Sequence, residues 1–575
     1  MTEDLNLSAA AVRLVEEIGA DRCFTVTGGM SMHLNWALSR SRSVRAVFCH
    51  QESCAVAAAE GYSKAHNLRR PGVAMITSGP AVTNALTGLA SCYGDSVPVL
   101  LLAGQVKTAD IAADRLRSHG VQEVDQLGLA KRVTKMARRV DSRNHQAVFE
   151  EAIRALSTGR LGPVYLEFPL DEQAFAVRHP IASSTTHDSA HAVPQTLPEL
   201  SQFKRPVVML GNGLRRHRHE LAPRLAELQR RMIPRLYTTS SMDLEPHDLP
   251  GNLGFPGPFA TIHANRVLGE CDLLVTLGAR LDLATTAYRP REFGSQAWRV
   301  VVDIDPDEIM KLGPMDRTNF VMADGLTVLD TIIDQGIAGE DSWMRQCMDW
   351  RASSLMEEGA RLDSDELTIR NVALMVSRYA EGMIVIPASS GLAIETFTRF
   401  FRPRSGTTFF NGSSLGSMGY GLSHAIGAAL SGCGAQGVWA FEGDGGLWMN
   451  VQELATLREN VPIGTVLFIF SNGGYASILR SQRANFDYEF GADRQSGLYI
   501  PPWKAVAEAV GIPYRMIESP DALLDLLSEW TPDNPTAVVE LRVPQSEDRG
   551  PVLTTRIIDG VPTTPPLRDL AWPGS

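Results

Sequence analysis

The feature of the sequence that most constrains its fold is a series of short apolar segments alternating with helical ones. Gly72–Thr77 and Val97–Ala103 are apolar at successive positions, and the preceding Glu52–His66 is rich in small residues with helical spacing. A strand that is apolar at every position is buried on both faces, as in parallel sheets covered by helices on both sides. The pattern therefore predicts an α/β fold with doubly wound, mostly parallel sheets.

The pattern occurs in three stretches of the chain, so we expect three doubly wound α/β domains. We place them at residues 1–180, 195–335 and 365–548, followed by a C-terminal tail at 549–575 that is rich in proline. A polar Ser/Thr/Pro stretch around His179–Glu199 is typical of a linker. A length of 575 residues fits three domains. The two outer units are expected to be variations on one architecture.

Composition excludes several classes of protein. The net charge is -11 and there is no long basic run, which argues against a nucleic-acid partner. No apolar run reaches the roughly 18–20 residues that a membrane span needs, and the N-terminus has no signal-peptide pattern. The seven cysteines form no CxxC pair. They indicate buried free thiols in a reducing compartment, so we expect a cytoplasmic enzyme.

The strongest chemical signal is a pair of glycine-rich motifs that each follow a predicted strand. Gly443-Asp444-Gly445 comes after the strand Gly437–Phe441, and Ser471-Asn472-Gly473-Gly474 comes after Thr465–Phe470. Because neighbouring strand ends of a parallel sheet bring their loops together, we expect the two motifs to meet. Either motif alone would be an ordinary turn; together they indicate a site.

This predicted site suits Mg²⁺ and a diphosphate. The carboxylate of Asp444, the amide oxygen of Asn472 and the carbonyl oxygen of Gly474 are hard oxygen ligands of the kind Mg²⁺ prefers. The glycines allow a phosphate to approach the backbone. We expect a helix after Gly446 to direct its N-terminus toward the anion.

These residues resemble the thiamine-diphosphate motif of the acetohydroxyacid synthase and pyruvate oxidase superfamily. That motif is GDG and NN, here separated by the 25 residues 446–470, with Ser471 in place of the first Asn and Asn472 in place of the second. The resemblance implies thiamine diphosphate and Mg²⁺ as cofactors. It also implies a homodimer or homotetramer with active sites at the subunit interface.

Further segments carry the same resemblance. Glu52 matches the glutamate that bonds the aminopyrimidine of the cofactor, although taken alone it is an ordinary N-terminal helix glutamate. Thr77–Asn84 resembles the loop beside that ring, with Ala81 departing from the usual glycine. Met418 matches the apolar side chain that supports the bent cofactor; its alternative role is core packing. The resemblance implies that the cofactor is bound by Gly29, Gly79, Pro80, Asn84, Ser390, Gly416, Met418, Gly443, Gly445, Gly446, Tyr475 and Ala476.

The same resemblance indicates the reaction. The loop ending in Gly29 and the glutamine Gln122 are similar to those of the synthases, and the paired histidines of pyruvate decarboxylase are missing. We therefore expect decarboxylation of a 2-keto acid such as pyruvate, with acyl transfer to a ketone or aldehyde acceptor. His33 and His119 are further catalytic candidates, although a lone histidine is more often structural.

The identity of the acceptor stays open at this stage. The QWQ segment of the synthases reads Arg480-Ser481-Gln482-Arg483 here, and GQHQ reads Ser390-Gly391-Leu392-Ala393. Both changes predict an acceptor other than that of branched-chain amino-acid synthesis. The alternatives are an acetolactate synthase, a non-oxidative decarboxylase and a catalytically silent homologue.

The middle unit resembles the flavin domain of the synthases. Gly211-Asn212-Gly213, Gly278–Asp282 and Asp303–Pro306 follow its segments, whereas Phe259-Ala260-Thr261 and Ala284 depart from it. Two interpretations remain: a structural FAD, or an empty domain that only holds the outer two together.

Overall fold

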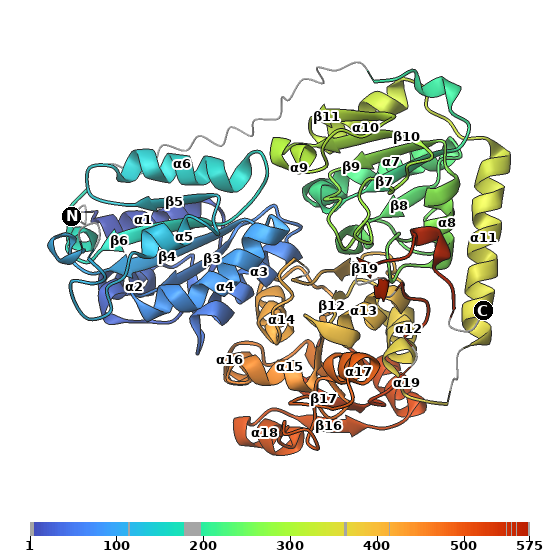
Figure 1. Ribbon diagram of the computed structural model, residues 1–575. Coiled ribbons are helices and arrows are strands. Elements are labelled where there is room, and N and C mark those ends of the chain that lie inside the picture. Colours follow the sequence, from blue (N-terminus) through green and yellow to red (C-terminus); the bar gives the residue numbers. More distant parts are fainter. Residues whose placement is uncertain are drawn as a thin grey trace.

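The computed structural model describes residues 5–112, 116–177, 197–361, 365–412, 414–547, 549–553, 555–558 and 561–572. These residues form three parallel sheets with helices on both faces, which confirms the predicted fold class (Figure 1). The predicted linker lies largely outside the described residues, in 178–196.

The N-terminal sheet has the strand order β2-β1-β3-β4-β6-β5, and every neighbouring pair is parallel. Its strands are β1 (Arg22–Thr25), β2 (Arg45–Phe48), β3 (Gly72–Ile76), β4 (Val99–Gln105), β5 (Met136–Arg139) and β6 (Val164–Pro169). Its main helices are α1 (Leu7–Glu17), α2 (Met32–Arg40), α3 (Glu52–Ala65), α4 (Pro80–Asp95), α5 (Gln126–Ala130) and α6 (His145–Ser157).

Strand β3 explains why the sequence pattern is continuous rather than alternating. Val73 and Met75 pack in a core with residues of α1, α2 and α6, whereas Ala74 and Ile76 pack in a second core with residues of α3 and α4. Each strand position therefore faces an apolar layer, and no position faces water.

The C-terminal sheet repeats the architecture of the N-terminal one. Its order β13-β12-β14-β15-β17-β16 places corresponding strands at corresponding positions, as expected for the two outer units. The strands are β12 (Ile384–Ile386), β13 (Thr408–Phe409), β14 (Val438–Gly443), β15 (Thr465–Ser471), β16 (Tyr514–Ile517) and β17 (Ala537–Arg542). The helices include α12 (Ile369–Tyr379), α13 (Gly391–Phe400), α14 (Tyr420–Leu430), α15 (Asp444–Leu447), α16 (Glu453–Asn460), α17 (Ala476–Asn485), α18 (Trp503–Val510) and α19 (Pro520–Ser528).

The central sheet is smaller and has the order β11-β10-β9-β7-β8. Its strands are β7 (Pro206–Leu210), β8 (Arg235–Tyr237), β9 (Leu273–Leu277), β10 (Trp298–Asp303) and β11 (Thr318–Met322). Its helices are α7 (Arg218–Arg230), α8 (Ile262–Glu270), α9 (Pro306–Met310) and α10 (Gly325–Asp334), and the long α11 (Asp341–Ala360) leads on to the C-terminal domain (Figure 1).

Helices α3 and α14 join the two outer domains. A Cβ atom on Gly427 would overlap the carbonyl oxygen of Ala58, and one on Gly61 would overlap the backbone of His424. The small residues that mark α3 in the sequence therefore allow two helix backbones to lie in close contact.

The C-terminal tail is partly folded and packs on the central domain. It contains a hairpin of β18 (Arg556–Ile558) and β19 (Val561–Thr563) and a single helical turn at Leu567–Asp569. The amide of Asn265 on α8 donates to the carbonyl of Leu567 (3.0 Å), and Leu570 and Trp572 are buried. The tail thus returns to the central domain (Figure 1).

Two features differ from expectation. Cys433 is exposed, although six of the seven cysteines are buried free thiols as predicted. Strands β5, β6, β8, β11, β13 and β16 were not predicted; β8 and β13 have only three and two residues, and β5 and β16 carry arginine in place of a continuous apolar run. Among the described helices, none combines the length and apolarity required to cross a bilayer.

Candidate cofactor site

The two glycine-rich motifs of the C-terminal domain meet at the ends of adjacent strands. β14 and β15 pair in parallel, with Gly443 opposite Phe470. Asp444 is only 1% exposed, and its carboxylate accepts hydrogen bonds from the backbone N–H of Gly445 (2.7 Å), Asn472 (3.0 Å) and Gly473 (2.7 Å). The structure therefore brings Asp444 and Asn472 together.

This junction has the chemistry of a cation site. The side-chain oxygen Oδ1 of Asn472 is buried and has no hydrogen-bond partner among the described residues, which is uncommon for a buried polar atom. Burial raises the pKa of Asp444 to about 6, and the N–H groups around its carboxylate oppose that rise. A buried carboxylate beside an unsatisfied amide oxygen suits a hard divalent cation. Gly474, the third predicted ligand, has a φ of +143° that favours glycine.

The glycines around Asp444 allow the surrounding loops to pack closely. A Cβ atom on Gly445 would overlap the ring of Tyr475, and one on Gly419 would overlap the carbonyl of Gly446. The helix expected after Gly446 begins instead at Asp444, as the four-residue α15, because Gly443 is the N-cap and the chain turns directly from β14. The short helix is continued by a helical turn at Trp448–Asn450.

Two further predicted segments border the same edge of the sheet. Ser390 is the N-cap of α13, and a Cβ atom on Gly391 would lie 3.3 Å from the hydroxyl of Ser477 in α17, so the turn after β12 lies beside Ala476. Gly416 has a φ of +64°, and the carbonyl of the half-buried Met418 accepts a hydrogen bond from Asn450 (3.2 Å).

Glu442 also belongs to this site, although it was not predicted from the sequence. Its carboxylate accepts hydrogen bonds from Ser389 Oγ (2.7 Å) and from the N–H of Gly421 (2.7 Å). It thus connects the turn after β12, the start of α14 and the strand that leads into Asp444. Burial raises the pKa of Glu442 to about 7. A charged residue at the end of an otherwise apolar strand is the sequence signal that marks it.

In the N-terminal domain the structure pairs predicted residues from distant segments. Glu52 begins α3, and its Oε2 accepts a hydrogen bond from Asn84 Nδ2 (2.9 Å) on α4, which starts at Pro80. Gly79 has a φ of +64°, and a Cβ atom there would overlap the carbonyl of Gln122. Gln122 itself has a φ of +59°, so both loops are held in unusual conformations where they touch.

The remaining predicted residues lie around the same end of this sheet. Gly29 begins a helical turn whose Met30 carbonyl packs against Gly104 at the end of β4. His33 is half-buried on α2, and His119 is exposed, with its backbone N–H donating to Glu123 (2.9 Å). No hydrogen bond among the described residues joins either histidine to Glu52.

Asn450 links the two outer domains next to the predicted site residues. Cys54, two residues after Glu52, donates from Sγ to Asn450 Oδ1 (3.1 Å), while Asn450 also holds the Met418 carbonyl. The N–H of His50 donates to Glu453 Oε1 (2.9 Å). Asn450 and Glu453 were not predicted as site residues; the available signal was two polar residues three apart in a segment between the two motifs.

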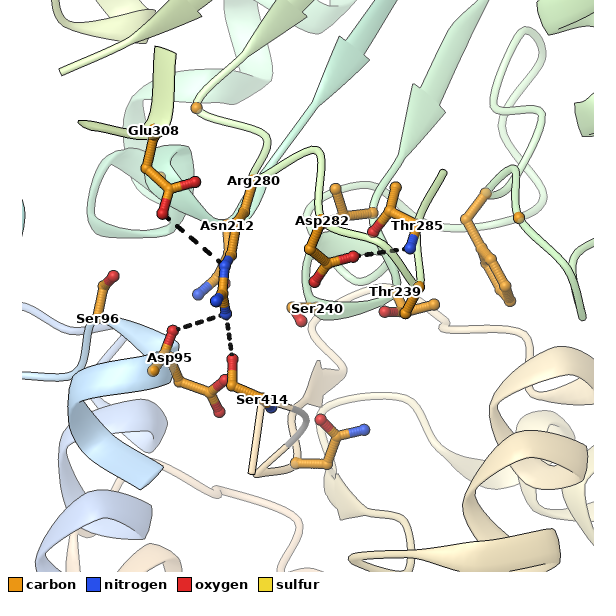
Figure 2. A pocket seen from close by; sticks show the side chains of 18 of the residues that line it. Asp95, Ser96, Asn212, Thr239, Ser240, Arg280, Asp282, Thr285, Glu308 and Ser414 are labelled. Atoms are coloured by element: carbon orange, nitrogen blue, oxygen red, sulfur yellow. Dashed lines mark hydrogen bonds and ion pairs between the residues drawn. The ribbon is translucent and has the colours of Figure 1, made fainter. Parts of the chain in front are cut away.

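A separate cavity lies where the three domains meet (Figure 2). Its volume is about 460 Å³. Arg280 crosses it, donating to the Gly94 carbonyl (3.0 Å) and to Ser414 Oγ (2.7 Å) and lying 3.9 Å from Glu308. The Gly211 and Gly278 loops touch one another at its wall, and Arg216 lines it without a hydrogen bond or ion pair from its side chain to the described residues.

Comparison with known families identifies the fold and its chemistry. Residues 5–129 match the N-terminal TPP binding domain of thiamine pyrophosphate enzymes, residues 193–330 their central domain and residues 390–541 their C-terminal TPP binding domain. The chain belongs to the thiamine pyrophosphate enzymes. Glu52 and Asn84 lie within the first of these matches, and Asp444 and Asn472 within the last.

Individual relatives place the chain more narrowly within the thiamine pyrophosphate enzymes. The chain is 30% identical to acetolactate synthase, chloroplastic, of Arabidopsis thaliana, over 87% of this chain and 76% of that one. It is 29% identical to a probable acetolactate synthase large subunit of Methanocaldococcus jannaschii, over 94% and 92% of the two chains. It is 26% identical to the acetolactate synthase large subunit of Lactococcus lactis, over 95% and 94%. This enzyme is therefore an acetolactate-synthase-like member that uses thiamine diphosphate, the same compound as thiamine pyrophosphate.

Proposed function

We propose that this enzyme decarboxylates pyruvate, or a near homologue, and transfers the acyl unit to a ketone or aldehyde acceptor, forming a carbon–carbon bond. The observation that carries the proposal is the pairing of two half-sites: Asp444 with Asn472 for the metal and diphosphate, and Glu52 with Asn84 for the pyrimidine ring. Similarity to acetolactate synthases along most of the chain supports the same chemistry.

Each half-site has a distinct task in the proposed reaction. When bound, thiamine diphosphate supplies the carbon nucleophile and accepts the electron pair that CO₂ leaves behind. Asp444, Asn472 and the Gly474 carbonyl would hold Mg²⁺, whose charge fixes the diphosphate. Glu52 would hold a proton at the pyrimidine ring, and Asn84 orients its carboxylate through the 2.9 Å hydrogen bond.

Gln122 supports ligation over aldehyde release. Its backbone packs against Gly79, so its loop lies beside the N-terminal half-site. An amide side chain does not release a proton near neutral pH, and early protonation of the acyl unit would yield an aldehyde. His33 and His119 stay candidates for proton transfer, since a partner subunit would change their surroundings.

The acceptor pocket is proposed to differ from that of branched-chain amino-acid synthesis. Gln482 on α17 accepts a hydrogen bond from the N–H of Phe490 (3.0 Å) and donates to its carbonyl (2.9 Å). It thereby fixes a loop that exposes the aromatic rings of Phe486, Tyr488 and Phe490. The second candidate function, acetolactate synthase with pyruvate as its own acceptor, is favoured by the similarity to proteins of that name.

A homodimer, or a tetramer built from it, is the proposed assembly. Large apolar side chains are exposed beside both half-sites, among them Phe48, Val121, Met449 and Ile478. Exposed apolar area of this kind marks a contact surface. A second subunit would cover it and bring a pyrimidine half-site to each diphosphate half-site.

FAD is proposed as a structural cofactor in the cavity between the domains. Gly213 and Gly278 line this cavity and have no side chain to keep a diphosphate from their backbones, and the half-buried Arg216 forms no ion pair with the described residues. A flavin held there would connect the three domains without taking part in the chemistry.

Product analysis tests the proposed reaction. The holoenzyme is supplied with labelled pyruvate, with and without a panel of ketones, aldehydes and keto-sugars. We expect slow turnover on pyruvate alone and a labelled acetyl adduct when an acceptor is added. Rapid formation of acetolactate as sole product would support the second candidate instead.

A further inference from the structure

A second large cavity lies away from both sites described above. Its volume is about 1100 Å³. It is walled by the chain after α3, by one face of α7 and the segment 243–250 of the central domain, and by residues 404–408 and 433 of the C-terminal domain. All three domains thus contribute to it, as they do to the cavity of Figure 2, but no lining residue is common to the two.

The lining of this cavity carries an excess of positive charge. Five arginines line it, against the two carboxylates of Asp243 and Glu245, and His66 and His219 are also present. The arginines are Arg69, Arg70, Arg218, Arg235 and Arg404. A cavity of this composition is expected to attract anions.

The carboxylates are already used by two of the arginines. Arg235 pairs with Glu245 (2.9 Å), and both side chains are almost fully buried. Arg218 pairs with Asp243 (3.1 Å), whose other oxygen is taken by Arg215 behind the cavity wall. Asp243 is thus shared by two arginines and Glu245 is paired with a third, so neither carboxylate compensates the charge of Arg69, Arg70 or Arg404.

The remaining arginines are available to a ligand. Arg69 is exposed and makes no ion pair within the described part of the chain. Arg70 donates to the hydroxyl of Tyr62 (3.3 Å), and Arg404 lies 3.7 Å from Asp248 in a largely exposed pair. An exposed ion pair of that kind contributes about 0–1 kcal/mol, so an anion can readily replace it.

An apolar wall lies beside the charged rim. Leu249 lines it and is 43% exposed, and the exposed Ala222 and Ala226 of α7 line it beside the core leucines Leu225 and Leu244. Arginine forks bind phosphate oxygens in pairs, and leucine side chains pack against a flat ring. A cavity of about 1100 Å³ with both a charged rim and an apolar wall is larger and less polar than a site for a single phosphate.

We propose that this cavity binds a nucleoside polyphosphate, with the phosphates on Arg69, Arg70 and Arg404 and the base against Leu249 and the exposed alanines of α7. The site is separate from the proposed active site. Glu52 begins α3 and the cavity adjoins its other end, and the 14 residues of the helix span about 20 Å. A bound nucleotide would fix the three domains relative to one another and leave the thiamine-diphosphate site free.

Calorimetry on the holoenzyme tests the proposal. The enzyme, saturated with thiamine diphosphate and Mg²⁺, is titrated with ATP, ADP, AMP and adenosine at low ionic strength. We expect affinity to fall in that order, and to fall further as salt is added, because the contacts are mainly charged. Equal affinity for ATP and adenosine would overturn the proposal.

Three variants locate the binding. The double variant Arg69→Gln/Arg404→Gln should weaken ATP at least tenfold, whereas Arg515→Gln, an exposed arginine on β16, should leave affinity unchanged. Both double-variant positions are at the rim, so the thermal midpoint should match that of the parent. Retained ATP affinity in the double variant, or loss of ATP binding in Arg216→Gln of the other cavity, would overturn the assignment.

Discussion

At the scale of single residues, the carboxylate of Glu52 is the group on which the proposed chemistry depends most. Glu52→Gln keeps the size of the side chain and the hydrogen bond that reaches Asn84, but it cannot hold a proton as a carboxylate does. We expect turnover to fall by a factor of about 10² or more with an unchanged thermal midpoint. Steady-state assays with Glu529→Gln, an exposed residue, provide the control. Wild-type turnover in Glu52→Gln would remove Glu52 from the catalytic set.

Asn472 allows a metal-binding role to be separated from a structural one. Asn472→Leu removes a buried amide oxygen that has no hydrogen-bond partner in the described part of the chain, so the cofactor-free protein should keep its stability or gain up to about 1 kcal/mol. The affinity for thiamine diphosphate with Mg²⁺ should fall at least tenfold. Thermal unfolding without cofactor and calorimetry with it measure the two effects. A destabilised cofactor-free protein would mean that the amide has an internal structural partner.

At the scale of helices and strands, the contact between α3 and α14 gives the clearest prediction. Gly427→Ala places a methyl group on the carbonyl of Ala58, so the two helices must separate. We expect a loss of about 1–3 kcal/mol or more in stability. Gly269→Ala on α8, where a Cβ atom meets nothing within 4 Å, should instead stabilise slightly. Chemical denaturation of both variants compares them, and equal effects would contradict close packing at Gly427.

Most strands of the three sheets could be predicted from the sequence, whereas most contacts between loops and between domains could not. The continuous apolar runs of β3 and β4 predicted parallel sheets, since burial on both faces leaves a direct trace in composition. The meeting of Asp444 with Asn472 followed from strand adjacency. The pairing of Gly79 with Gln122, and the link from Cys54 through Asn450 to Met418, could not be predicted, because they depend on loop conformation and domain packing.

At the scale of the whole molecule, one buried charge cluster connects the outer domains. Lys64 Nζ lies 2.6 Å from Glu60 and 2.8 Å from Asp95 in the N-terminal domain, and it also donates to the carbonyl of Asn411 in the C-terminal domain. His424 on α14 lies 3.3 Å from Glu60. All of these side chains are less than 10% exposed. The relative placement of the two domains therefore depends on a network that water does not screen.

Replacing Lys64, the cation at the centre of this network, should destabilise the protein. Lys64→Met removes the cation beside Glu60 and Asp95 while both carboxylates stay buried, and breaking a buried pair in this way costs about 3–5 kcal/mol. Lys504→Met, from an exposed pair with Glu508, should cost less than about 1 kcal/mol and is the matched control. Unfolding followed by tryptophan fluorescence measures both.

The pH dependence of that loss distinguishes charge from packing. Although burial alone would raise it, the pKa of Glu60 is lowered from 4.5 to about 2 by Lys64 and His424. Its contribution to stability is therefore complete above about pH 4.5 and disappears as the pH falls toward 2. Without Lys64 the carboxylate is buried with less compensation and gains stability on protonation. The difference between wild type and Lys64→Met should thus be largest at neutral pH and shrink on acidification. A difference that stays constant from pH 7 to pH 3 would show that Lys64 acts through packing and not through its charge.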